Sequence, residues 1–409
     1  MARPAATSVR RGELVELSVE TVPSIDDERA EGWDALAGPD DFYQSRDWLA
    51  VVERDNTATP QYLLALAAGR LVGALPLYEV KHEIASAYQP EKLRSLLGEP
   101  GDHLLAGARR CYRSEIMVTR SLAETVRQRI TAALVRAALA AAAERGLSGI
   151  GLRYLPTAAL TRLGRVAPVV ACFDDGEAVV EDVGAGLDAY LGRQSSKLRS
   201  KIRREMRKLA ETGWRVDVRP LAECLDDVAR LVSYVEEHHG NDTPDFLLRR
   251  LFRRQIEEAE DREVVFTCHD ERDELVACAV NYAWRDTLYS RVVGLDYDRL
   301  GGTFAYFNLL LYRAIEYAAA HGLDRLQLGL ATPSKAERGA VVRPLWAAAV
   351  QVGAGHGPPG VRIVRPESAS RWSEPYRCYA HALPAPDWSI PPAGKLNGRE
   401  TGAASGRGA

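Results

Sequence analysis

The sequence is short of cysteine and has no long apolar run. Its 409 residues contain six cysteines, and no two of them form a CxxC pair. This scatter argues against a zinc ribbon and a disulfide framework, and it is typical of a protein that folds in a reducing compartment. No stretch approaches the roughly 18 uninterrupted apolar residues of a membrane-spanning helix. We therefore expect no membrane span and no metal site.

The chain also lacks an excess of charge of either sign. Its 53 basic and 56 acidic residues give a net charge of −3, so no global field draws the protein to DNA or to a membrane. Residues 1–13 hold three arginines and no apolar segment, which argues against a secretory signal peptide. We expect a cytoplasmic protein in which any contact with nucleic acid comes from a local basic patch.

Three common catalytic signatures are missing as well. The sequence contains no GxSxG nucleophile elbow, no Walker phosphate loop and no HExxH zinc motif. The α/β-hydrolase, P-loop nucleotidase and zincin interpretations therefore lose their usual support.

What the chain does contain is a weak internal repeat. In the first half, two predicted strands (62–67 and 71–79) precede a helix (121–145) and a further strand (149–154). The second half repeats this order with strands at 263–269, 275–284 and 287–295, a helix at 303–321 and a strand at 325–329. Helical segments precede both copies, at 26–37 and 45–55 and again at 222–238 and 244–258. Two similar α/β units in tandem are the simplest explanation.

Local sequence echoes between the copies also suggest where they differ. The strands are offset by 204 residues and the later helices by 176, so the first copy holds 28 extra residues. We place them at 81–107, as an irregular insertion that forms a lid or a substrate loop. The predicted division is a flexible N-terminus (1–12), a first unit (13–186), a second unit (187–383) and a disordered tail rich in Pro, Gly, Ala and Ser (384–409).

Four stretches resemble the tandem-GNAT acyltransferases of the FemAB-like and BioF2-like groups, a family often labelled peptidoglycan biosynthesis or recognition. They are residues 104–118, 190–214, 291–329 and 335–339. The resemblance implies an α/β (α+β) fold of two tandem GNAT-like units, with mixed sheets flanked by helices. It also implies an N-acyltransferase or aminoacyltransferase that forms an amide on an amine acceptor, with the donor held by the second unit.

The first candidate site is the loop 298–303, which follows a strand and opens a helix. Free backbone N–H groups and the positive end of the helix would converge there and suit a pyrophosphate. The resemblance implies that this loop holds coenzyme A, through Arg299, Gly301, Gly302 and Thr303. Phe304 stands where the family pattern has Gly or Ala. The alternative is a strand-to-helix turn with Thr303 as its N-cap.

The second candidate is a basic amphipathic helix predicted at 195–211. Seven of the twelve residues in 197–208 are Lys or Arg, and an apolar stripe recurs every three or four residues. Lys197, Lys201 and Arg204 are candidates to contact the phosphates of tRNA or of a nucleotide donor. The alternative is a solvated helix whose basic side chains cover apolar surface.

The third group comprises candidates for proton transfer, because an attacking amine must lose a proton and a leaving group must gain one. Glu237 and His239 belong to a dense titratable cluster at the end of a predicted helix, and the resemblance implies that the loop there lines the acceptor pocket. The helix dipole alone would also favour His at that position. Tyr306, within about one turn of the loop 298–303, is the candidate proton donor.

Four further residues are candidates for binding the acceptor. Asn281 and Arg291 lie on neighbouring predicted strands, whereas Lys335 and Arg338 match a family Lys-x-x-Arg-Gly motif. Two cations three residues apart beside a strand end would hold a carboxylate or phosphate, or would neutralise the nearby Glu337.

The identity of the donor stays open at the level of sequence. An acyl-CoA thioester is the first expectation, with a small-molecule or peptide amine as acceptor. One alternative is aminoacyl-tRNA, for peptide-bond formation in cell-wall or natural-product biosynthesis. Another is a non-catalytic protein that binds a cell-wall precursor or a peptide.

Overall fold

The computed structural model describes residues 17–364, except for 56, 84–87, 100, 242, 260–261 and 354–357. The predictions for the N-terminus 1–12 and for the tail 384–409 lie outside the described residues. Among the described residues, no helix combines the length and the apolar character needed to cross a membrane.

Within the described residues, a single mixed sheet of fourteen strands runs through the molecule. The strands of the first half are β1 (Leu17–Val22), β2 (Ala58–Ala67), β3 (Arg70–Val80), β4 (His103–Ala106), β5 (Met117–Val118), β6 (Gly149–Pro156) and β7 (Pro168–Val180). Those of the second half are β8 (Arg215–Arg219), β9 (Glu263–His269), β10 (Leu275–Trp284), β11 (Thr287–Leu295), β12 (Arg325–Leu330), β13 (Val341–Gln351) and β14 (Gly360–Ile363). The predicted mixed, helix-flanked architecture is confirmed, although the expected sheets are joined into one.

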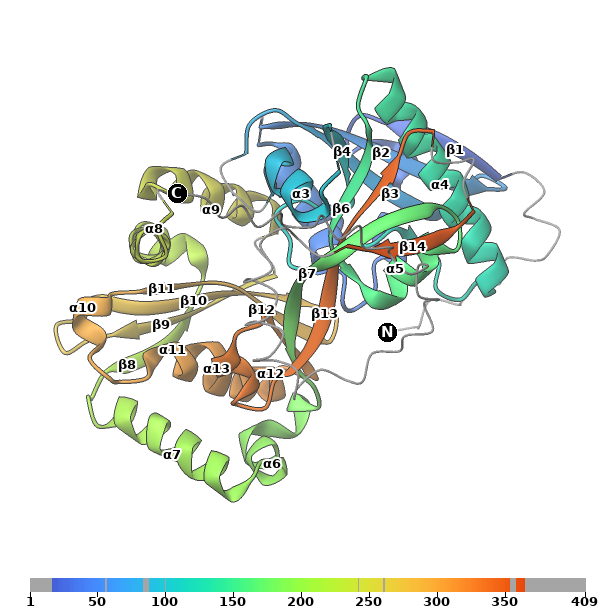
Figure 1. Cartoon of the computed structure of the whole chain (residues 1–409). Helices are drawn as coiled ribbons and strands as arrows, with labels where there is room; N and C mark the ends of the chain where they lie inside the picture. Colours follow the sequence, from blue (N-terminus) through green and yellow to red (C-terminus); the bar gives the residue numbers. More distant parts are fainter. Residues whose placement is uncertain are drawn as a thin grey trace, which may run out of the picture.

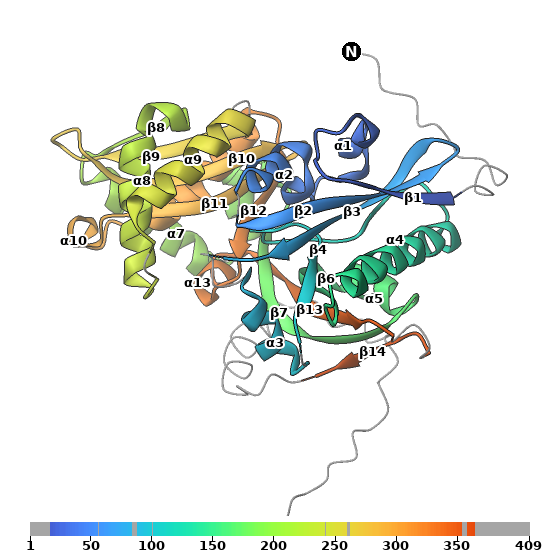
Figure 2. The same cartoon turned by 90° about the horizontal axis from the view of Figure 1, so that it is seen from above.

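Helices cover the first half of this sheet. They are η2 (Glu28–Ala30), α1 (Trp33–Leu36), η3 (Phe42–Gln44), α2 (Arg46–Glu53), α3 (Pro90–Leu97), α4 (Glu124–Glu144) and α5 (Thr157–Gly164). Figure 2 shows α4 lying along the sheet, where its buried side chains Ile130, Leu134 and Ala138 meet the apolar face of β2 and β3. The expectation of an irregular segment at 81–107 is wrong, because α3 and β4 lie within it.

The second half has helices on both faces of the sheet (Figure 1). Its helices are η5 (Val183–Ala185), α6 (Gly186–Arg193), α7 (Ser196–Ala210), α8 (Leu221–His238), α9 (Asp245–Ala259), α10 (Tyr297–Leu300), α11 (Ala305–Phe307), α12 (Ala314–Ala320) and α13 (Pro333–Ala336). A π-helix, η7 (Asn308–Arg313), joins α11 to α12. Helices α8 and α9 lie over one face, and α11 to α12 lie over the other with α7 outside them.

Two long strands, β7 and β13, belong to both halves of the molecule (Figure 1). They pair antiparallel from Val341 opposite Val179 to Ala349 opposite Val170. The end of β7 also pairs with β12, whereas β13 pairs with β6 of the first half along most of its length. Strand β13, from the C-terminal half of the chain, therefore pairs directly with the strands of the N-terminal half.

Candidate functional site

The candidate site lies where strands β11 and β12 separate. These parallel strands are paired only from Thr287 opposite Arg325 to Tyr289 opposite Gln327. Beyond that point β11 continues to Leu295 and β12 to Leu330 without further pairing to each other. We call this the β11–β12 opening. Because the backbone groups along it are not used in a ladder between the two strands, other groups can bond to them.

A side chain of the first half, Tyr112, lies inside the β11–β12 opening. Its hydroxyl donates a hydrogen bond to the backbone oxygen of Arg291 in β11 (3.0 Å). Its ring lies close to β12, because a Cβ placed on Gly329 would be 3.3 Å from it. Tyr112 is within the 104–118 stretch that carried the family resemblance, but no motif or spacing in the sequence singles it out.

The side chain of Arg291 is enclosed by aromatic rings. The guanidinium carbon lies 4.7 Å from the ring centre of Tyr112, 5.2 Å from that of Trp48 and 5.8 Å from that of Tyr43. The residue is half-buried. Among the described residues, no carboxylate and no hydrogen-bond acceptor pairs with its guanidinium. We call Arg291 and these three rings the arginine cage.

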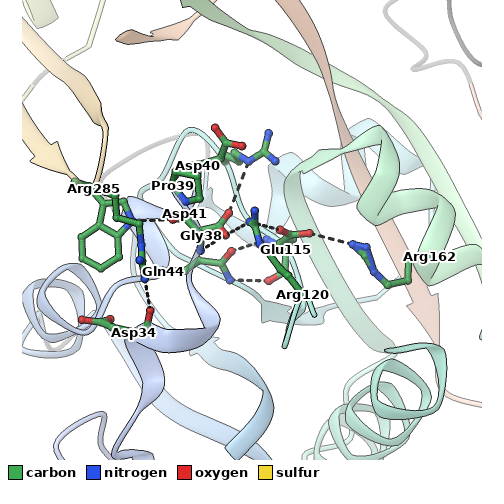
Figure 3. A network of polar contacts seen from close by, with 12 residues as sticks. Asp34, Gly38, Pro39, Asp40, Asp41, Gln44, Glu115, Arg120, Arg162 and Arg285 are labelled. Atoms are coloured by element: carbon green, nitrogen blue, oxygen red, sulfur yellow. Dashed lines mark hydrogen bonds and ion pairs between the residues drawn. The ribbon is translucent and has the colours of Figure 1, made fainter. Parts of the chain in front are cut away.

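A polar network holds the loop that brings Tyr43 into the arginine cage (Figure 3). The buried carboxylate of Asp41 accepts a hydrogen bond from the backbone N–H of Gly38 (2.8 Å) and pairs with Arg120 (2.5 Å). The amide of Gln44 exchanges two hydrogen bonds with the backbone of Glu115, at 2.6 and 2.9 Å. These contacts fix the residues on both sides of Tyr43, so the position of its ring is set by the first half.

The same loop is docked onto the second half. Trp284 donates its indole N–H to the backbone oxygen of Gly38 (2.8 Å), and the hydroxyl of Tyr289 donates to the backbone oxygen of Pro39. Arg325 forms an ion pair with Asp40 at 2.9 Å. The cage therefore lies at a fixed junction between the two halves rather than within either one.

Tyr306, the predicted proton donor, lies within electrostatic range of Tyr112, the residue inside the opening. It is half-buried, and its ring packs edge-on against Phe307 with 4.7 Å between centres. Burial, reinforced by Tyr297 and Tyr112, raises the pKa of its hydroxyl to about 12. Among the described residues no partner accepts from or donates to this hydroxyl. The hydroxyl is therefore neutral at pH 7.

The other two proton-transfer candidates are on the surface. Glu237 and His239 are exposed at the end of α8, and Glu237 lines a groove of about 720 Å³ between α8 and α9. It is His238, not His239, that stacks on Tyr297, with 4.1 Å between ring centres. No contact among the described residues joins His239 to Tyr306. The structure therefore does not bring these two proton-transfer candidates together.

The loop 298–303 differs from the prediction in two respects. Arg299 is ion-paired with Asp270 and with Glu274 (2.6 Å), so its charge is already neutralised. Thr303 is not the N-cap, because Phe304 precedes α11 in the left-handed region at φ 57°. The predicted anion loop therefore has neither its free cation nor its capping residue in the expected form.

The two glycines of this loop, however, remain accessible. Gly301 and Gly302 are exposed and have positive φ values of 34° and 82°. A Cβ at Gly302 would meet no atom within 4 Å. There is room for a ligand beside this turn.

Arg338 is an internal residue and does not face a substrate. Its guanidinium makes two hydrogen bonds to the carboxylate of Glu205 in α7, at 2.6 and 3.0 Å. The same carboxylate accepts a hydrogen bond from the hydroxyl of Tyr312 in the π-helix, and the guanidinium lies over the ring of Phe307 at 3.3 Å. The expectation that Arg338 binds a carboxylate of the acceptor is wrong, because a carboxylate of the chain already occupies it.

Lys335 is buried beside the end of β12. Its ammonium donates to the backbone oxygens of Leu328 (2.6 Å) and Leu330 (2.7 Å). Burial lowers its pKa to about 8, and the nearby Asp175 acts in the opposite direction. Near pH 8 such an amine can accept or donate a proton.

Asn281, the fourth acceptor-binding candidate, is fully buried within the sheet. Its amide donates to the backbone oxygens of Val264 (3.1 Å) and Ala279 (3.0 Å) and accepts from the hydroxyl of Ser290 (2.8 Å). The register of β10 and β11 shifts at this position. Asn281 satisfies backbone groups at a β-bulge, so the expectation of a substrate contact is wrong.

Helix α7 has the two faces that its sequence predicts. Ser195 caps the helix by accepting from the N–H of Leu198 (3.3 Å). Ile202 and Leu209 are buried in the apolar core of the second half. Lys197 and Arg204 are exposed, whereas Lys201 is ion-paired with Glu337 (3.0 Å). The outer face therefore carries cations that a polyanion can reach.

Comparisons with known proteins agree with this architecture. FemX is similar in fold, with a TM-score of 0.57 and 12% identity over 82% of this chain and 98% of that one. A conserved protein of unknown function from Bacteroides thetaiotaomicron has a TM-score of 0.50 and 12% identity over 80% of this chain and 94% of that one. No curated protein sequence matches the chain. The sequence profile of a family described as peptidoglycan biosynthesis/recognition matches residues 116–354, which is more than half of the chain. The chain therefore belongs to the FemAB-like family.

Proposed function

We propose that the protein transfers an aminoacyl or acyl group to an amine and so forms an amide. The observation that carries the proposal is the hydroxyl of Tyr306, which has no partner among the described residues and whose pKa is raised in part by Tyr112 of the β11–β12 opening. When an amine attacks an ester carbonyl, a C–N bond forms and a C–O bond breaks, and the leaving oxygen needs a proton. A neutral phenol with a pKa of about 12 can supply that proton at pH 7. The proton lost by the amine restores the phenol.

Three features favour an aminoacyl ester of tRNA as the donor. Tyr112 fills the β11–β12 opening, so a thioester arm has no free backbone edge to bind there. Arg299, the cation expected to hold a pyrophosphate, is paired with carboxylates. The outer face of α7, with Lys197 and Arg204 exposed, suits the phosphates of a polynucleotide.

Acyl-CoA is the second candidate donor, and the accessible turn at Gly301 and Gly302 favours it. Both glycines are exposed, and the space beside Gly302 is open. Backbone N–H groups at such a turn can bind a pyrophosphate.

A transfer assay tests the function directly. The purified protein would be incubated with labelled aminoacyl-tRNAs, or in parallel with labelled acetyl-CoA, and with a muramyl peptide that carries a free amine. We expect label in an amide product, and a loss of about 10²-fold or more in Tyr306→Phe. Tyr317→Phe is the matched control, because Tyr317 is also half-buried and follows on the same helical segment, where it stacks on His321 at 3.8 Å.

The two donors give distinct results. Binding of acetyl-CoA that Gly302→Trp abolishes would select the acyl-CoA candidate. Under the tRNA candidate, wild type does not bind acetyl-CoA, and Tyr112→Ala gains some binding as the opening is vacated. If no donor reacts while the muramyl peptide still binds, the protein is a binding module and the proposed transfer is wrong.

A further inference from the structure

Buried arginines in this protein are paired with carboxylates. Arg109 pairs with Glu83 (2.9 Å), and Arg153 pairs with Asp174 (2.6 Å). The same holds for Arg110 with Glu83 and for Arg338 with Glu205. This is expected, because an unpaired charge out of water is costly.

Arg291 is half-buried and has no such partner in the described part of the chain. Three rings surround its guanidinium, yet no carboxylate or hydrogen-bond acceptor among the described residues satisfies its N–H groups. Ring faces attract a cation, but they offer no lone pair in the plane of the guanidinium. The stacking therefore compensates the charge in part and leaves the N–H donors free.

The wall of the cage holds a second unsatisfied donor. The hydroxyl of Tyr43 is buried and has no hydrogen-bond partner in the part of the chain that the structure describes. A buried hydroxyl without a partner is uncommon, so a bound ligand or water is expected to supply the missing hydrogen bond. Because Arg291 can only donate, a ligand that satisfies the cage must carry acceptor oxygens and a negative charge.

We propose that the arginine cage binds a carboxylate group of the substrate. A carboxylate is planar and accepts two parallel hydrogen bonds from a guanidinium, which suits a fork held between flat rings. The cage adjoins the β11–β12 opening, because Tyr112 is one of its walls and bonds to the backbone of Arg291. The assignment of this carboxylate to the substrate rests on the proposed function. The binding of a carboxylate by the cage does not depend on it.

A purely structural role makes a different prediction. If Arg291 only clamps the two halves together through its rings, its loss would lower stability and no small anion would bind at the cage. Stability alone therefore cannot separate the two roles, and the test must measure ligand binding.

The test uses small carboxylates as probes and needs no turnover. Wild type would be titrated with acetate and with N-acetylglycine, at constant ionic strength set with chloride, and followed by thermal shift. We expect both probes to stabilise wild type saturably. We expect Arg291→Gln to bind them at least about tenfold more weakly. Tyr43→Phe should weaken binding by a smaller factor.

A matched control exists in Arg262. Its guanidinium also lies over a tryptophan, 4.7 Å from the ring of Trp284, but it is ion-paired with Asp47. Arg262→Gln should bind the probes as wild type does. If Arg291→Gln does not fold, Arg291→Lys keeps the charge without the fork and should still show the weakened binding.

Three results would overturn the proposal. The first is the absence of saturable binding to wild type at up to about 50 mM probe, where even a weak Kd would be visible. The second is equal binding to wild type and to both Arg291 variants. The third is saturation by inorganic phosphate with no response to the carboxylates, which would assign the cage to a phosphate instead. None of them bears on the transfer assay, so the two failures are distinguishable.

Discussion

At the scale of single residues, the pair Glu205 and Arg338 ties three elements together. Glu205 is fully buried in α7, and its carboxylate is shared by Arg338 and by Tyr312 of the π-helix. The backbone oxygen of the same residue accepts from Asn308 (3.2 Å). A residue that the sequence places in a basic helix is therefore the internal anchor of that helix.

Removing the charge of Glu205 should be costly. In Glu205→Gln the guanidinium of Arg338 stays buried without its anion, so we expect a loss of about 3–5 kcal/mol in the free energy of unfolding. Urea denaturation measures it. The comparison is Lys208→Gln, which breaks an exposed pair with Glu211 and should change stability by less than about 1 kcal/mol. Similar losses in both variants would contradict the anchoring role.

Lys335 gives a prediction that depends on pH. Burial lowers its folded-state pKa to about 8 from 10.5, so between these values the unfolded chain binds more protons than the native one. Stability contributed by this residue therefore rises with pH across that interval, and below pH 8 the charged form is a constant penalty of about 3 kcal/mol.

The variant Lys335→Met removes this dependence. The unfolding free energy of wild type minus that of the variant should increase by about 3 kcal/mol between pH 8 and 10.5. Chemical denaturation at several pH values follows it. A constant difference over this range would mean that the native pKa is not lowered.

At the scale of elements, helix α7 has a buried inner face and a basic outer face. Its inner face holds Ile202, Glu205 and Leu209 against the second half, whereas Arg203 and Arg207 are exposed. Packing in the fold and the proposed contact with phosphate therefore depend on different side chains of this helix, so separate variants can test each of them.

Charge reversal on the outer face should affect nucleic acid binding but not folding. The double variant Arg203→Glu with Arg207→Glu should keep its circular dichroism and melting profile. We expect it to bind tRNA at least about tenfold more weakly, with the slope of log affinity against log salt reduced by up to about 2. Arg129→Glu with Arg136→Glu, on the exposed side of α4, is the control. Equal effects of the two pairs would indicate only a general charge effect.

At the scale of the whole molecule, the shared strands make the two halves interdependent. Strand β13 pairs with β6 of the first half along most of its length, and β7 pairs with β12 of the second. Neither half can keep all its strand partners when the other is removed.

The chain should therefore unfold in one cooperative step. Calorimetry of the full chain is expected to show a single transition with equal calorimetric and van't Hoff enthalpies. A fragment spanning 187–364 should not fold by itself, because β13 would lose both β6 and β7. Two resolved transitions, or a folded fragment, would show that the shared strands contribute little.

The sequence by itself determined the local elements. The hairpin of β2 and β3 follows from two apolar runs around Ala68 and Gly69, both of which have positive φ. The apolar stripe and the cap at Ser195 likewise place α7 within a residue of its predicted start. Period and capping act over a few residues, so they can be read directly from the chain.

Only the tertiary structure decided which side chains meet. Tyr112 and Arg291 are 179 residues apart, and Glu205 and Arg338 are 133 apart. From the sequence alone, Arg291 and Arg338 were both candidates to bind the acceptor. In the folded chain Arg338 pairs with the carboxylate of Glu205, whereas Arg291 contacts only aromatic rings. Long-range packing brings acceptors to some donors and not to others.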